Sequence, residues 1–114
     1  MTRGSPLTTD SPTSSQRITA EVTSWPGVAA APGRRGEFAF TVGSRRPLGH
    51  LHGDRVAHFS FPKALWAQLR AEGRITDHPV FPGKQGPAAR RIESEADVED
   101  VIALLRLNYD RATG

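Results

Sequence analysis

The chain has 114 residues, a length that accommodates one domain and excludes a second folded unit. Hydrophobic residues make up 37% and charged residues 24%, which favours one modest core over a disordered chain. The absence of cysteine excludes a disulfide scaffold, a thiolate zinc site and a cysteine nucleophile. No apolar run approaches the about 18 residues of a membrane span, and residues 1–15 lack the apolar segment of a signal peptide. We therefore expect a cytoplasmic protein without a membrane partner.

The charge is distributed unevenly along the chain. Residues 34–91 hold eleven basic and four acidic side chains, whereas residues 92–114 hold six acids and two arginines, for a formal net charge of +3 over the whole chain. A basic surface can attract nucleic acid or anionic molecules. A plainer explanation is a GC-rich genome, because 13 of the 15 basic residues are arginine and Ala, Gly and Pro are abundant. We therefore do not expect a nucleic-acid partner.

The first half of the chain predicts a leader, a helix and a meander of strands. Residues 1–14 consist mostly of Ser, Thr, Pro and Gly and predict a disordered leader, with the domain covering residues 15–112. Ile18, Val22 and Trp25 recur at helical spacing and predict a first helix, which Pro26-Gly27 ends. Apolar alternation and turn signals predict four short strands, at residues 28–31, 37–42, 47–52 and 55–59.

A second helix is predicted after Phe61. Pro62 suits its first turn, Leu65, Trp66 and Leu69 form an apolar stripe, and Gly73 is expected just beyond its end. Trp25 and Trp66 are interpreted as core anchors. Residues 75–81 predict a short extended segment, and Pro79 argues against a central strand there.

The last part of the chain predicts a strand followed by a helix. Residues 88–92 favour a final strand, and Ser94 with Asp97 indicates a capping box before a helix of about 15 residues. Together the elements predict an α+β fold: a single domain with three helices packed on a mostly antiparallel sheet of four or five strands.

The run Gly49-His50-Leu51-His52-Gly53-Asp54 is the most informative chemical motif. Residues two apart on a strand share a face, so the two imidazoles can converge on one point. Such a pair could hold a metal if His78, His58 or Asp54 completed the site. Because H-x-H is only half of a site, we expect no bound metal and no effect of zinc on stability.

The candidate catalytic residues are His50, His52, Asp54 and His78. The imidazoles would contact a ligand or transfer protons near neutral pH, and Asp54 would orient one of them. The alternative is that His50 and His52 lie on a solvated sheet face, hydrogen-bonded to their neighbours, and that His78 is a cap or turn residue.

Other familiar sites are not indicated. Ser60 and Ser94 lie outside a G-x-S-x-G elbow, and neither G-x-G-x-x-G nor G-x-x-x-x-G-K-[ST] occurs. The sequence thus excludes nucleotide binding by such loops and identifies no cofactor.

The order of the motifs resembles a known family. These motifs are Gly49-His50-Leu51-His52-Gly53-Asp54, Phe61-Pro62, Leu69 to Gly73-Arg74, His78, Phe81-Pro82, Ile92-Glu93-Ser94-Glu95-Ala96-Asp97-Val98 and Leu104-Leu105-Arg106-Leu107-Asn108-Tyr109. Over about residues 17–112 the chain resembles the luciferase-domain family of small, mostly uncharacterised bacterial and fungal proteins. The resemblance implies a small single domain and carries no established reaction, substrate or catalytic residue onto this chain. It also implies a Gly-Trp pair before the last strand, where this sequence has Gly86-Pro87-Ala88.

Two classes of function stay open. One is an enzyme or small-molecule binder that uses the histidines, with an unknown small molecule as its partner. The other is a non-catalytic binding module for nucleic acid or protein that uses a basic face built from Arg34, Arg35, Arg45, Arg46, Arg90 and Arg91. The sequence leaves the oligomeric state open, and the distances between His50, His52 and His78 would best separate the two classes.

Overall fold

The computed structural model describes residues 11–114. Residues 1–10 of the predicted leader lie outside this range. Helix α1, Ser14–Val22, begins with a reciprocal cap: the Thr13 hydroxyl accepts from the Gln16 backbone N–H, and the Gln16 side chain accepts from the Thr13 N–H. The cap satisfies backbone donors that the first turn leaves free. Among the described residues, the first helix therefore has its N-cap at Thr13.

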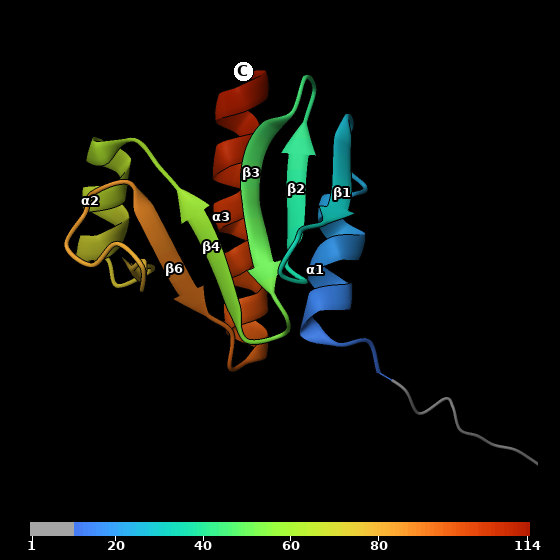
Figure 1. The fold of residues 1–114 in the computed structure, drawn as a ribbon, viewed down its shortest axis with the longest axis horizontal. Helices are drawn as coiled ribbons and strands as arrows, with labels where there is room; N and C mark the ends of the chain where they lie inside the picture. The colour runs from blue at the N-terminus through green and yellow to red at the C-terminus, as the bar shows by residue number, and fades with distance from the viewer. Residues whose placement is uncertain (1–10) are drawn as a thin grey trace, which may run out of the picture.

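Six strands form one antiparallel sheet, where four or five were predicted (Figure 1). The spatial order is β1-β2-β3-β4-β6-β5. The additional strand is β5, which has two residues and lies at the edge, and Pro79 shortly after it cannot donate to a sheet ladder. The strands are β1 Val28–Pro32, β2 Phe38–Val42, β3 Arg46–His52, β4 Val56–Ser60, β5 Thr76–Asp77 and β6 Pro87–Arg91.

Helix α2, Lys63–Ala71, follows Pro62 and ends as predicted. Gly73 has a φ of +74° and its N–H donates to the Arg70 carbonyl, while the Arg74 N–H donates to the Leu69 carbonyl. Glycine tolerates this left-handed conformation, which closes the end of a helix.

Helix α3, Glu95–Thr113, has 19 residues and is longer than predicted. The Ser94 hydroxyl accepts from the Asp97 N–H, as the capping pattern requires, but the Asp97 carboxylate accepts from the Glu93 N–H instead of closing the box on Ser94. No helix within residues 11–114 is both long and apolar enough to cross a membrane.

The core lies between the sheet and the two helices α1 and α3, which run behind the strands in Figure 1. Trp25 and Trp66 are buried, as predicted, with 7% and 8% of their surfaces exposed. The face of β3 and β4 toward the viewer in Figure 1 carries no helix. The three helices and the antiparallel sheet confirm the α+β class.

Strands β3 and β4 pair over only part of their length. Their ladder joins His50 to His58, Leu51 to Ala57 and His52 to Val56, whereas on its other edge β4 pairs with β6 along its whole length, from Val56 to Ser60. On its other side β3 contains a bulge, because Phe40 pairs with Gly49 and Thr41 with Pro47, which leaves Leu48 as an extra residue. The two strands therefore diverge at this end.

The buried side chain of Asn108, on α3, bridges the divergence. Its amide nitrogen donates to the Leu48 carbonyl at 3.0 Å and to the Ser60 carbonyl at 3.2 Å. Its amide oxygen accepts from the Arg111 guanidinium at 2.6 Å. Two carbonyls that have no partner in the β3–β4 ladder are thereby satisfied from the helix.

Gly49 permits the close approach of β3 to its neighbours. Its φ is +152°, and a Cβ atom added there would lie 2.9 Å from both the His58 carbonyl oxygen and a methyl group of Leu105. A side chain would therefore collide with backbone, which cannot move aside cheaply.

Replacing Asn108 by leucine should lower the free energy of unfolding by about 1–3 kcal/mol, because the buried bond to the Leu48 carbonyl and the partly buried bond to the Ser60 carbonyl are lost. Urea unfolding monitored by tryptophan fluorescence measures this change. The control is Gln68→Leu on the exposed side of α2, where the amide contacts only Glu72; there we expect a change within about 0.5 kcal/mol. Equal stability of the Asn108 variant and the parent would contradict the role given to this amide.

Candidate functional site

His50 and His52 project from the face of β3 opposite to the buried Leu51. Both are half-buried, and their ring centroids lie 4.8 Å apart. The period of two along the strand brings the pair together as the motif suggested.

His58, on β4, faces the same pair. It lies directly opposite His50 in the β3–β4 ladder, and its ring centroid is 5.2 Å from that of His50 and 4.4 Å from that of His52. The side chain is buried, with 7% of the residue exposed. The sequence placed His58 only among the possible third metal ligands, and the structure makes it the centre of the cluster.

His78 reaches the cluster from the far side of β6. It follows β5, and its ring centroid lies 4.1 Å from that of His58. Ala89, on β6 between β4 and β5, pairs with both His58 and Thr76. Paired residues share a face of the sheet, so the small side chain of Ala89 leaves room for His78 above β6. All four histidines of the chain thus meet in one cluster, which we call the histidine cluster.

Asp54 lies outside the histidine cluster. It is exposed in the turn between β3 and β4, and its carboxylate accepts from the Ser15 backbone N–H at 2.8 Å. This bond attaches the turn to the first residues of α1. Asp54 therefore has a structural partner and is not placed as an orienting group for an imidazole.

The surroundings of the cluster favour the neutral form of three imidazoles, those of His50, His58 and His78. Burial, with the neighbouring histidines His78, His52 and His50 acting in the same direction, lowers the pKa of His58 to about 4. Burial also lowers the pKa of His50, with His52 acting in the same direction and Glu37 opposing it. The pKa of His78 is lowered first by burial and then by His52. At neutral pH these rings retain an unprotonated nitrogen that can accept a proton, a hydrogen bond or a metal ion.

One fully buried nitrogen of the cluster has no partner among the described residues. Among the described residues, Nδ1 of His58 is the buried side-chain polar atom that makes no hydrogen bond. An unsatisfied buried polar atom costs about 1–3 kcal/mol. Such an atom in a native structure calls for an explanation, such as an ion or water molecule that completes its bonding.

A pocket of about 490 Å³ opens beside the histidine cluster, where β3 and β4 diverge. His50, His58 and His78 lie on its wall, and we call it the histidine pocket. Its other lining residues are Pro47, Leu48, Gly49, Phe59, Ser60, Phe81, Pro87, Asn108 and Arg111. Pro87 stands in the segment where the family resemblance implies a tryptophan, so the pocket is lined there by a proline ring.

The pocket has one cationic end and one apolar rim. Arg111 is exposed, bonds to the Asn108 amide oxygen and makes no ion pair with any residue in 11–114. Phe81 is 46% exposed, and its ring centroid lies 5.3 Å from that of His78, with the two ring planes tilted by 46°. An exposed aromatic ring next to a pocket is suited to contact with an apolar ligand.

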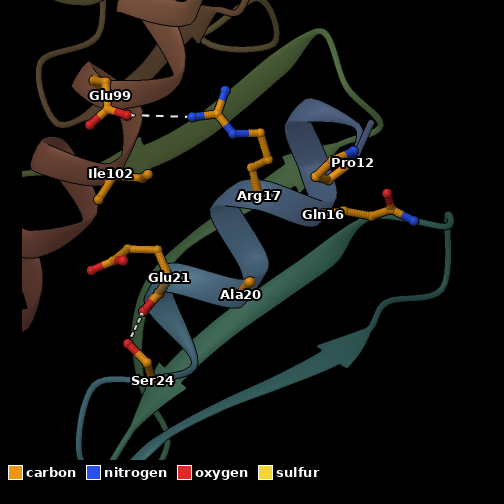
Figure 2. Close-up of a pocket in the computed structure, with 8 residues that line it drawn as sticks. All are labelled: Pro12, Gln16, Arg17, Ala20, Glu21, Ser24, Glu99 and Ile102. Atoms are coloured by element: carbon orange, nitrogen blue, oxygen red, sulfur yellow. Dashed lines mark hydrogen bonds and ion pairs between the residues drawn. The ribbon is translucent and has the colours of Figure 1, made fainter. Parts of the chain in front are cut away.

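A second concave surface lies between α1 and α3 and has about 600 Å³ (Figure 2). In Figure 2, Arg17 points from α1 toward Glu99 on α3, with which it forms an ion pair at 3.6 Å. The Ser24 hydroxyl donates to the Glu21 carbonyl. Arg17, Glu99 and Ser24 thus have protein partners in this groove, whereas Nδ1 of His58, which lines the histidine pocket, has none among the described residues.

Sequence reasoning missed Asn108 and Arg111 as parts of the site. Asn108 gave a signal: it occupies the apolar face of α3, four residues after the buried Leu104 and seven after Val101. A polar residue at such a position needs a buried partner. Arg111 follows one turn later on the same helix, and nothing in its own sequence position distinguishes it.

The lowered pKa of His58 predicts a loss of stability in mild acid. The unfolded chain has a histidine pKa near 6.5, and the folded protein has about 4. Between these values the unfolded state binds a proton that the folded state does not, so stability should fall as the pH falls through this window. The loss is at most about 3 kcal/mol from this residue.

Urea unfolding of the parent and of His58→Leu, at pH 7 and at about pH 4.5 with EDTA present, isolates this effect. Carboxylates titrate equally in both proteins, so their effects cancel. The parent should lose more stability than the variant over this interval. Equal losses would show that His58 is not the source.

Comparison with known proteins identifies the family. The model of the Luciferase domain family matches residues 45–108, which is more than half of the 114 residues and includes all four histidines and Asn108. No curated protein and no solved structure matches the chain. The match confirms the resemblance that the motif order indicated, and the chain therefore belongs to the luciferase-domain family.

Proposed function

We propose that this luciferase-domain protein binds a small organic molecule in the histidine pocket, and that it acts on the molecule or holds it through the imidazoles. The observation that carries the proposal is the presence of three imidazoles, from His50, His58 and His78, on the wall of one pocket. Small-molecule sites are concave, mostly apolar and equipped with a few convergent polar groups.

The lining residues indicate the class of ligand. Leu48, Phe59 and Phe81 provide apolar and aromatic contacts, which favour a ligand with a flat or aromatic body. At the Asn108 end, the Arg111 guanidinium lies on the rim and makes no ion pair with other described residues. An anionic group such as a carboxylate would find there a charged donor. We therefore expect an aromatic or largely apolar molecule with one anionic group.

The alternative, a binding module with a basic face, has less support. Arg34 and Arg35 lie in the turn before β2, and Arg45 and Arg46 lie at its other end. Arg90 is engaged by Asp97 at 2.6 Å and Asp100 at 2.8 Å, and it is largely covered. These arginines are spread over the two ends of the sheet instead of forming one phosphate-binding surface.

Titration of ¹⁵N-labelled, metal-free protein with benzoate and 1-naphthoate tests the proposal. We expect saturable shifts of backbone amide signals at residues 48–50, 58–60, 78–81 and 108–111. Arg111→Met should weaken binding about tenfold, a loss of about 1.4 kcal/mol, because the anion loses its charged partner.

The matched control is Arg91→Met, which removes the same charge from a side chain that is 78% exposed and pairs only at 4.0 Å with Glu93. It should bind the probes as the parent does. Ser60→Trp should fill the pocket and abolish the shifts. Shifts that map to the groove between α1 and α3, or the absence of saturable shifts with either probe, would contradict the proposal.

A further inference from the structure

We propose that His50, His52 and His58 form a three-histidine site for a divalent first-row transition-metal ion, with Zn²⁺ as the ion most suited to it. One nitrogen from each of the three rings lies within 4.8 Å of the other two. The proposal replaces the expectation of no bound metal, which rested on His50 and His52 as half of a site, because His58 adds a third imidazole. It goes beyond ligand binding in the pocket and rests on the imidazoles alone, whatever molecule the pocket takes.

The backbone supplies the geometry. Two ligands stand two residues apart on β3, and the third lies across the ladder on β4, directly opposite His50. In a tetrahedral site with Zn–N bonds of about 2.0–2.1 Å, ligand nitrogens lie about 3.4 Å apart. The three nitrogens already lie within 4.8 Å of one another, and small side-chain rotations would bring them to that spacing with no change in the strands.

The chemistry of the donors selects the ion. The site offers imidazole nitrogens and no thiolate, because the chain has no cysteine. Neutral imidazoles suit zinc, copper, nickel and iron, whereas magnesium and calcium prefer oxygen ligands.

The unpartnered Nδ1 of His58 is an independent observation in favour of a bound ion. It is buried, and no described group within the protein bonds to it. The neighbouring rings do not compensate, since no hydrogen bond between histidines of the cluster is present in residues 11–114. A polar atom in this position is suited to bind an ion that comes from solution.

His78 is placed beside the site and not among its ligands. Its Nδ1 accepts from the Val80 backbone N–H at 3.1 Å, and the ring packs against His58. With three protein ligands, one coordination position would stay open, which is the arrangement of zinc ions that take part in reactions. Two of the three ligands, His50 and His58, also line the pocket.

Isothermal titration of the full chain without an affinity tag, after treatment with EDTA, tests the proposal with ZnCl₂ and with MgCl₂. One Zn²⁺ should bind at micromolar or lower concentration and raise the melting temperature, and Mg²⁺ should do neither. His50→Ala, His52→Ala and His58→Ala should each weaken zinc binding at least about tenfold. The two half-buried residues His50 and His52 keep the test valid if the His58 variant does not fold.

Two controls separate this site from others. His78→Ala removes the remaining histidine and should change the affinity less than about threefold. Glu95→Gln combined with Glu99→Gln removes the exposed acids at the start of α3 and should leave zinc binding unchanged.

The outcomes decide the proposal. Absence of saturable zinc binding, or binding that survives the loss of both His50 and His52, would overturn it. An effect of His78→Ala as large as that of the other histidines would overturn the three-ligand site in favour of four ligands. Because the aromatic probes are titrated into metal-free protein, failure of zinc binding and failure of the pocket are distinguishable.

Discussion

The hydrogen bonds of the Asn108 amide hold apart two strands that would otherwise continue side by side. The amide donates to a carbonyl of β3 and to one of β4 beyond the last residue pair of their ladder. The Leu48 bulge gives β3 the bend that this separation requires. Without the divergence there would be no pocket, and the imidazoles would lie on a continuous sheet surface. The site thus depends on a polar residue inside the apolar face of α3.

The sequence predicted the elements better than their arrangement. Alternation and turn residues indicated five of the six strands, and the capping residues indicated both ends of α2 and the start of α3. The register between β3 and β4 depends on the bulge and on the turn around Asp54, which no local pattern fixes. The sequence therefore could not show that His58 lies opposite His50, nor that the Asp54 carboxylate accepts a hydrogen bond from the Ser15 N–H. The insertion of β6 between β4 and β5 is likewise a result of tertiary packing.

Small and charged residues around the cluster serve its assembly. Ala89 lets His78 approach His58 across β6, although His58 lies on β4 and His78 follows β5, two strands that are not adjacent. The ion pairs of Arg90 with Asp97 and Asp100 join β6 to the start of α3, and Arg74 joins the same Asp100 at 2.6 Å. Because these pairs are partly shielded from water, they fix the position of β6 better than exposed pairs would. Much of the basic excess seen in the sequence is thus used within the fold.

The bulge at Leu48 also determines how this family member can change in length. Side chains alternate across the sheet, so the loss or gain of one residue between the bulge and the turn would exchange the two faces of β3. His50 and His52 would then point into α3, and Leu51 would face solvent. Loops outside the cluster, such as residues 82–85, can absorb insertions because they pair with no strand. Homologous chains that keep the histidine cluster should therefore differ in length in their loops and conserve the spacing from the bulge to the hairpin turn.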